Sequence, residues 1–177
     1  ALGEVGIGNT TVAAALAALL LDVAPAEVVG LGAGADTAML RRKTEVVGAA
    51  LARVRRSRGG APCSPEEALA AVGGPEFCVL AGAVLGAASV GAVTVLDGLA
   101  TTVAALVAMR IEPGASAYLV AGQRSRECGH DLVLDHLGLE PLLDLRLRAG
   151  EGVGAALAAS MLISGLTLRR RIGRTAL

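Results

Sequence analysis

Stretches rich in alanine, leucine and valine alternate along the chain with short apolar runs that end in polar or glycine-rich loops. The longer stretches predict helices over residues 13–21, 39–54 and 76–90 and from residue 99 onwards. The short runs predict strands over residues 27–31, 92–96 and 117–120, with a further strand or an extended turn over 142–147. Short strands separated by helices indicate parallel βαβ units. We therefore expect residues 1–177 to form a single α/β domain, in which helices flank a mostly parallel sheet in a Rossmann-like, three-layer arrangement.

One helix start is well defined by its side chains. Residues 64–67 read Ser-Pro-Glu-Glu, with Ser64 in the capping position, Pro65 in the first helical position and Glu67 three residues after the cap. Proline suits the first turn of a helix, and a serine followed three residues later by a glutamate predicts a capping box. A helix is therefore expected to begin here.

The longest apolar stretch, residues 79–109, raises the question of a membrane-spanning helix. Such a helix needs about 20 apolar residues, and a carboxylate in the middle of the span is costly. Here Asp97 and Gly98 interrupt the stretch near its middle, and no belt of aromatic residues flanks it. The stretch is therefore better divided into a helix, a strand and a second helix, and no membrane association is expected.

Composition narrows the range of partners. The 16 basic and 16 acidic residues cancel, and the aromatic residues are limited to Phe77 and Tyr118. A chain without net positive charge or aromatic platforms is not expected to bind nucleic acid. Its three cysteines lack the paired spacing of a disulfide framework or a zinc site, and no basic segment with a cleavage signal precedes an apolar run. We therefore expect a reducing, cytoplasmic setting.

Two glycine-rich loops each carry a glutamate directly before an alanine-rich helix. The first reads GEVGIGNTT over residues 3–11 and contains Glu4, and the second reads RAGEGVG over residues 148–154 and contains Glu151. Backbone N–H groups in such a loop can surround an anion, and the dipole of the following helix favours negative charge there. Either loop alone is equally consistent with a tight turn. Together they predict one site with anion-binding loops and an acid or base.

Further polar residues could complete a site for a phosphate and a ribose. Gly30, Gly32 and Gly34 form a third glycine-rich loop, which could present more backbone donors. The candidate side-chain donors to a phosphate are Lys43, Arg124, Ser125 and Arg148. For Lys43 the alternative is a solvated helix face. Asp97 ends an apolar strand, where it could accept a ribose hydroxyl or cap the strand.

Other phosphate and metal motifs are missing from the sequence. It has no diphosphate-binding loop of the G-x-x-x-x-G-K-[ST] type and no pair of adjacent acidic residues after a strand, which would suit Mg²⁺ on a pyrophosphoryl ribose. His130 and His136 lie close to Cys128 but have no matching ligands elsewhere. Neither a metal site nor a cofactor is therefore expected.

Three long motifs in register resemble the nicotinate-nucleotide–dimethylbenzimidazole phosphoribosyltransferases of cobalamin nucleotide-loop assembly. They are GEVGIGNTT at 3–11, VAGQRSRECGH at 120–130 and RAGEGVGAA at 148–156, and shorter segments fit between them in the same order. The resemblance covers about residues 1–165. It implies transfer of phosphoribose from nicotinate mononucleotide to 5,6-dimethylbenzimidazole, which gives α-ribazole 5′-phosphate and nicotinate.

The resemblance also implies a role for each matched residue. Glu151 matches the family's general base, and Glu4 matches a second carboxylate near the reacting centre. Positions that match nucleotide or phosphate binding are Gly6, Gly32, Gly34, Gly98 and Ser125, with Lys43, Asp97 and Arg148 as expected neighbours. Ala149 stands where the family usually has a larger apolar residue against the base, and Gln123 stands where it has a histidine.

The family's known architecture sets two further expectations. Its members are homodimers about twice as long as this chain, which resembles their second half, so the resemblance implies a homo-oligomer. The first half, which helps to form the benzimidazole pocket in the family, is not in this sequence. Two functions are consistent with these observations. One is a transferase or its catalytic half, and the other is a module that binds nicotinate mononucleotide or phosphate without turnover.

Overall fold

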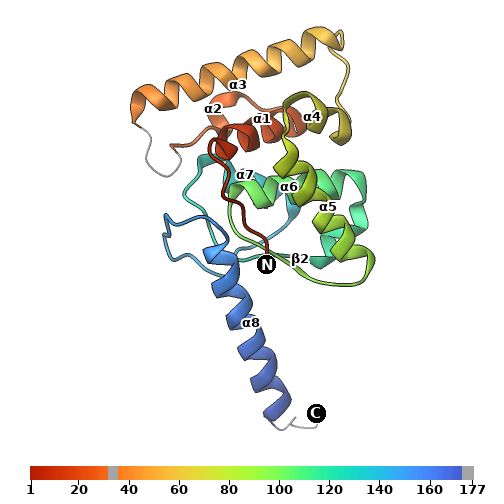
Figure 1. The fold of residues 1–177 in the computed structure, drawn as a ribbon, viewed down its shortest axis with the longest axis vertical. Helices are drawn as coiled ribbons and strands as arrows, with labels where there is room; N and C mark the ends of the chain where they lie inside the picture. Colours follow the sequence, from red (N-terminus) through yellow and green to blue (C-terminus); the bar gives the residue numbers. More distant parts are fainter. Residues whose placement is uncertain (32–35, 173–177) are drawn as a thin grey trace.

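The computed structural model describes residues 1–31 and 36–172, so the predicted site residues Gly32 and Gly34 lie outside the described part. Figure 1 shows a helical body from which one long helix projects. The helices are α1 (Asn9–Leu21), α2 (Pro25–Val28), α3 (Thr37–Ser57), α4 (Pro65–Val72), α5 (Pro75–Ser89), α6 (Leu99–Ile111), α7 (Cys128–Leu137) and α8 (Val153–Arg171), with a 3₁₀ helix, η1, at Pro113–Tyr118. The strands are β1 (Thr94–Leu96) and β2 (Leu119–Ala121).

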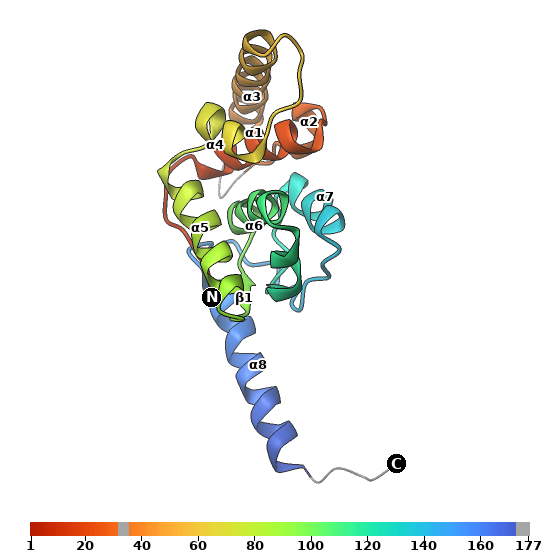
Figure 2. The same cartoon turned by 90° about the vertical axis from the view of Figure 1, so that its right-hand side faces the viewer.

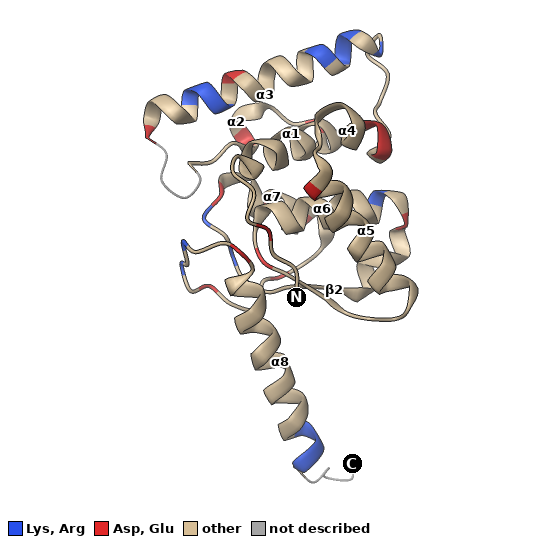
Figure 3. Cartoon of the chain, in the orientation of Figure 1, with Lys and Arg blue, Asp and Glu red and all other residues tan. Residues whose placement is uncertain are grey.

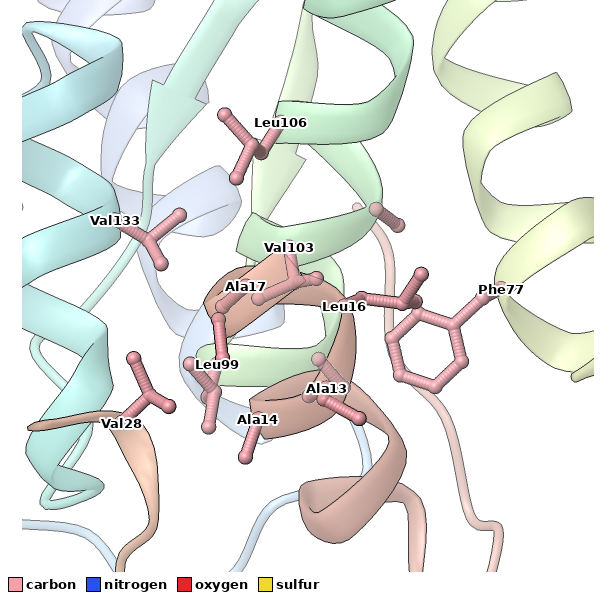
Figure 4. Packing of buried hydrophobic residues seen from close by; sticks show 14 of the residues in the cluster. Ala13, Ala14, Leu16, Ala17, Val28, Phe77, Leu99, Val103, Leu106 and Val133 are labelled. Carbon is pink, nitrogen blue, oxygen red and sulfur yellow. The ribbon is translucent and has the colours of Figure 1, made fainter. Parts of the chain in front are cut away.

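The core is built on α1 and α6, two helices that are apolar around nearly their whole circumference. Residues 13–18 of α1 are at most 5% exposed, and residues 103–108 of α6 are completely buried. A helix that is apolar all round is typical of a buried position. Helices α3 and α4 pack against α1, α5 and α7 pack against α6, and α1 and α6 contact each other (Figure 2). Figure 4 shows Leu16, Phe77 and Val103 in this core, where alanines let the helices approach closely.

The two strands form a small parallel sheet. Thr94 lies opposite Leu119, and this register continues to the ends of both strands. The start of the chain runs beside β1, because the backbone N–H of Leu2 donates to the carbonyl of Val95 at 2.9 Å. Residues at the beginning of the chain are therefore held close to the carboxyl ends of the strands.

The parallel pairing continues briefly beyond β2. Gln123 forms an isolated parallel bridge with Leu143. Apart from this bridge, residues 142–147 form no regular strand. The α/β class expected from the sequence is confirmed, with parallel strands of three residues each in a helix-rich fold.

Most predicted elements are confirmed. The helices expected over 13–21, 39–54, 76–90 and from 99 are α1, α3, α5 and α6, and the strands expected over 92–96 and 117–120 contain β1 and overlap β2. The capping box at the start of α4 is also present. The N–H of Glu67 donates to Ser64 Oγ at 3.2 Å, and the N–H of Ser64 donates to Glu67 Oε2 at 2.8 Å.

The strand predicted over residues 27–31 is wrong, because the short helix α2 occupies its first half. Pro25 takes the first helical position, and the Glu27 carboxylate accepts the N–H of Ala24 at 2.7 Å. This helix-start chemistry outweighs the β propensity of the valine pair that follows it. Both valines are buried, so an apolar pattern that is common to buried strands and buried helices misled the prediction.

Helix α8 projects away from the body in both views (Figures 1 and 2). Its first turns pack beside β1, where Ala155 and Ala158 are buried. Apolar side chains further along the helix are 45–65% exposed, and they are Leu157, Met161, Ile163, Leu166 and Leu168. Its last turn carries Arg169, Arg170 and Arg171, visible as blue ribbon in Figure 3. Within the described ranges, the helices are all too short or too polar to cross a membrane.

Candidate active site

The structure gathers the two glutamate-bearing loops around one cavity of about 480 Å³. The cavity lies beyond the carboxyl ends of β1 and β2 and at the N-termini of α1 and α8. The predicted site residues in its wall are Glu4, Gly6, Asp97, Ser125, Arg148, Ala149 and Glu151. This is the position where loops of a parallel α/β fold converge on a ligand.

The first loop is folded around the carboxylate of Glu4. Glu4 Oε2 accepts the backbone N–H of Gly6 at 2.8 Å and also accepts the side-chain amide of Asn9. Asn9 is the first residue of α1 and is 6% exposed. The carboxylate therefore closes its own loop onto the helix N-terminus, which fixes its place in the cavity wall.

The second loop holds Glu151 in an unusual backbone conformation. Its φ of 57° lies in the left-handed region, between φ values of 66° at Gly150 and 83° at Gly152. A non-glycine residue in this region costs about 1–3 kcal/mol, and such residues concentrate at functional sites. Gly3 of the first loop packs directly against this backbone. A Cβ atom at Gly3 would lie 2.5 Å from Gly152 Cα, which is too close for any side chain. The two loops thus meet through their glycines, and their glutamates border the same cavity.

Asp97 connects the end of β1 to the start of α8. Its Oδ1 accepts the N–H of Ala155 at 3.1 Å, and its Oδ2 accepts the N–H of Gly152 at 3.3 Å. The side chain is 6% exposed, so these hydrogen bonds are largely shielded from water. The first turn of a helix leaves several N–H groups without partners, and a carboxylate there is favourable. Asp97 therefore caps a distant helix and holds the Glu151 loop against the sheet.

Lys43 approaches the cavity from α3. Its ammonium group donates to Thr10 Oγ1 at 2.9 Å and to the carbonyl of Gly30 at 3.4 Å. Thr10 lines the cavity, whereas Lys43 lies directly behind it. Lys43 is therefore half-buried and packs against the first glutamate loop and the start of the third glycine-rich loop.

The Ser125 loop is anchored by a buried histidine. The N–H of Ser125 donates to His130 Nδ1 at 2.9 Å, so the ring proton lies on Nε2, which donates to Thr102 Oγ1 at 3.0 Å. The Thr102 hydroxyl in turn donates to the carbonyl of Gly98 at 2.9 Å. This chain of hydrogen bonds ties the loop after β2 to the loop after β1, and it does so with a completely buried imidazole.

Burial lowers the pKa of His130 to about 4, and the nearby positive charge of Arg124 acts in the same direction. The unfolded chain binds a proton at this position near pH 6.5, so its protonation favours unfolding as the pH falls. The stability from neutral His130 is therefore complete above about pH 6.5, and roughly 3 kcal/mol of it is lost by about pH 4. Urea unfolding between about pH 7 and pH 4.5 measures this loss. A His130→Asn variant should show a shallower pH dependence, and equal slopes for both proteins would contradict the prediction.

Some predicted residues lie outside the cavity wall. Gly98 supports it from behind, because a Cβ atom there would lie 3.4 Å from Ser125 Cβ. Arg124, a candidate phosphate donor, forms an ion pair with Asp131 at 3.4 Å and does not line the cavity. Its neighbour Arg126 does line it and was not predicted.

Other residues at or behind the cavity were given no role from the sequence. Among them are Asn9, which holds the Glu4 carboxylate, Gln123, which lines the wall, and His130. Asn9 lies inside the GEVGIGNTT motif and could have been singled out as a polar residue at a helix start. The sequence offers no local signal for His130, whose partner Thr102 is 28 positions away.

Side chains that could bind a metal ion are not gathered anywhere in the described part of the chain. Among the residues that the structure describes, no three or more His, Cys, Asp or Glu side chains are placed to hold one. His136 instead contacts the Arg110 guanidinium at 3.0 Å, and Cys63, Cys78 and Cys128 are all free thiols.

Comparison with known proteins places this chain in one class. A family model described as "Phosphoribosyltransferase" matches residues 1–176, so the chain is of the phosphoribosyltransferase class. A crystal structure of CobT from Thermus thermophilus superposes with a TM-score of 0.85 and 47% identity, over 92% of this chain and 47% of that one.

Similar sequences narrow the class. A nicotinate-nucleotide–dimethylbenzimidazole phosphoribosyltransferase from Bradyrhizobium diazoefficiens is 44% identical over 94% of this chain and 46% of its own length. Proteins of the same name from Thermus thermophilus and Mycobacterium tuberculosis are each 48% identical, over 92% and 90% of this chain and 47% and 43% of their own lengths. The chain belongs to the nicotinate-nucleotide–dimethylbenzimidazole phosphoribosyltransferase family. It spans about half the length of the curated relatives that it matches.

Proposed function

We propose that this chain carries the catalytic site for phosphoribosyl transfer from nicotinate mononucleotide to 5,6-dimethylbenzimidazole. The observation that carries the proposal is the meeting of the two glycine-rich loops, which puts Glu4 and the strained Glu151 around one cavity at the carboxyl ends of the parallel strands. Relatives that bear the name of this activity support it. In this proposal residues 1–177 act as a single α/β domain.

The donor nucleotide would bind through its phosphate and its ribose. The glycine-rich loops that contain Gly6, Gly32 and Gly34 are proposed to bind the phosphate, with Lys43 and Ser125 as side-chain donors. Arg148 lines the cavity beside the Glu151 loop and adds a further cation. Gly98, in the backbone after β1, lies next to the Ser125 loop. Ala149 offers a small apolar surface to the incoming base.

Glu151 is proposed as the general base. As one ring nitrogen of the benzimidazole attacks C1′ of the ribose, the Glu151 carboxylate takes the proton from the other ring nitrogen. The bond from C1′ to nicotinate breaks, and its electron pair neutralises the pyridinium nitrogen. Attack from the face opposite nicotinate inverts C1′ and gives α-ribazole 5′-phosphate.

Glu4 is proposed to act beside the reacting carbon. Positive charge develops on the ribose as the bond to nicotinate breaks, and a carboxylate nearby stabilises that charge. Its hydrogen bonds to Gly6 and Asn9 hold the Glu4 carboxylate in one position before the reaction begins. The step balances with the two substrates and these carboxylates, so the proposal includes no cofactor.

The test is a calorimetric titration with nicotinate mononucleotide, followed by addition of 5,6-dimethylbenzimidazole and detection of nicotinate. Binding followed by release of nicotinate would support the transferase. Binding without release would favour the alternative, a nucleotide-binding module without turnover. That alternative has one observation in its favour, namely that the chain covers less than half of its relatives' length. Absence of binding would contradict both functions.

The exposed apolar side chains of α8 support a proposal of self-association. Side chains such as Ile163 and Leu166 are 65% and 53% exposed on a helix that stands clear of the body. Contiguous apolar surface of this kind marks protein interfaces. We expect a homo-oligomer, a dimer in its simplest form, when light scattering is recorded after size exclusion.

A control for self-association is the double variant Ile163→Glu and Leu166→Glu. Light scattering should give it a lower mass in solution than the native chain. A stable, monodisperse monomer of the native chain would contradict this proposal. A reducing cytoplasm, in which three free thiols remain reduced, belongs to the same proposal.

A further inference from the structure

Gln123 is a buried polar residue that no step of the proposed reaction uses. It follows β2 by two residues, lines the cavity and is 4% exposed. Within residues 1–31 and 36–172, two buried side-chain atoms lack a hydrogen-bond partner, Gln123 Oε1 and Glu127 Oε2. Both residues line this cavity, and Gln123 is the more enclosed of the two. Unpaired buried polar atoms are rare in native proteins, so each one calls for a partner.

The fold makes a specific place for the Gln123 side chain. It lies against Gly154 in the first turn of α8, where a Cβ atom would come within 2.3 Å of both Cγ and Cδ of Gln123. Any other residue at position 154 would therefore displace the carboxamide. The bridge between Gln123 and Leu143 fixes the backbone beneath it. The carboxamide is thus held in the cavity wall by two segments that lie far from it in the sequence.

The neighbouring groups do not supply the missing donor. At the start of α8, the N–H groups of Gly152 and Ala155 donate to Asp97, and the N–H of Val153 donates to the carbonyl of Gly150. Turning the carboxamide by 180° exchanges Oε1 with Nε2 and replaces a buried acceptor with a buried donor. A hydroxyl group satisfies either arrangement because it both donates and accepts. A phosphate oxygen accepts and would satisfy the carboxamide in only one of the two arrangements, and the proposed mechanism assigns the imidazole N–H of the second substrate to Glu151.

We propose that Gln123 is a substrate-binding residue, whose carboxamide hydrogen-bonds a ribose hydroxyl of the donor nucleotide and so discriminates against the analogue that lacks that hydroxyl. This inference rests on the proposed function, because it takes nicotinate mononucleotide as the ligand. The contact fixes the rotation of the sugar, and hence the direction from which C1′ is approached. A site built to bond a hydroxyl discriminates against the analogue that lacks it, since its own polar group is then left unpaired.

The test compares nicotinate mononucleotide with its 2′-deoxy and 3′-deoxy analogues by calorimetry. The native chain should bind one of the analogues about tenfold more weakly than the ribonucleotide. In Gln123→Met, which keeps the shape of the side chain without its polar atoms, the ribonucleotide should bind about tenfold more weakly and that discrimination should disappear. Leu145→Met introduces the same side chain at an exposed residue outside the cavity wall and should discriminate as the native chain does.

The outcomes separate this inference from the proposed function. If the native chain binds the ribonucleotide and both deoxy analogues equally, the inference is overturned, and this result needs no variant to fold. Unchanged discrimination in a folded Gln123→Met variant overturns it as well. If the native chain does not bind nicotinate mononucleotide at all, the proposed function fails and the inference fails with it.

Discussion

Glu151→Gln is expected to slow the release of nicotinate by about 10²–10⁴-fold while nicotinate mononucleotide binds nearly as before. Glutamine has almost the same shape as glutamate and preserves the loop, but its amide cannot take the proton from the benzimidazole. Because the nucleotide does not depend on that proton transfer, its dissociation constant should change little. Calorimetry for binding and chromatography for nicotinate measure the two effects separately on the same preparation.

A matched control makes this result specific. Glu140→Gln is the same chemical change at an exposed residue outside the cavity wall, and it should leave both binding and transfer unchanged. Parallel loss of binding and transfer in Glu151→Gln would contradict a role confined to proton transfer.

Asp97→Ala is expected to lower the free energy of unfolding by about 2–4 kcal/mol. The alanine removes the acceptor for the N–H groups of Gly152 and Ala155 and leaves them at the start of α8 without a partner. Because those N–H groups hold the Glu151 loop against the sheet, transfer should also fall in whatever fraction of the protein remains folded. Urea unfolding gives the first quantity, and nicotinate release per folded chain gives the second.

Two variants serve as references for Asp97→Ala. Asp144→Ala removes a carboxylate from an exposed loop position and should change stability by less than about 0.5 kcal/mol. Asp97→Asn keeps one oxygen acceptor, so its free energy of unfolding should lie between those of the native chain and Asp97→Ala. If Asp97→Ala is as stable as Asp144→Ala, then Asp97 does not cap α8 in solution.

Local chemistry explains which elements the sequence predicts correctly. The start of α4 depends on Ser64, Pro65 and Glu67, which are close together in the sequence and interact with one another. The buried helices α1 and α6 are long enough that their composition alone distinguishes them from strands. The segment 27–31 is short and mostly apolar, and the decisive contact joins its first residue, Glu27, to Ala24, which lies outside the segment.

The sequence indicates the part of the candidate site that consists of glycine-rich loops at the ends of strands and the starts of helices. Seven predicted residues line one cavity because parallel strands end at the same edge of a sheet. The contacts of Asp97 with α8, and of His130 with Ser125 and Thr102, depend on how distant segments pack. A linear pattern carries no information about such pairings. The roles assigned to Glu4, Glu151 and the residues around them remain predictions.

The contact of Gly3 with Gly152 has a consequence for the order of folding. The contact closes a loop that contains most of the chain. Closing such a loop costs conformational entropy, and this cost comes before the contact can stabilise the fold. Contacts of large sequence separation therefore form slowly, whereas α1, α3 and α4 can associate soon after they are synthesised. We therefore expect the two glutamates to come together late in folding, so that a chain arrested at an intermediate stage would have a core but not the proposed catalytic site.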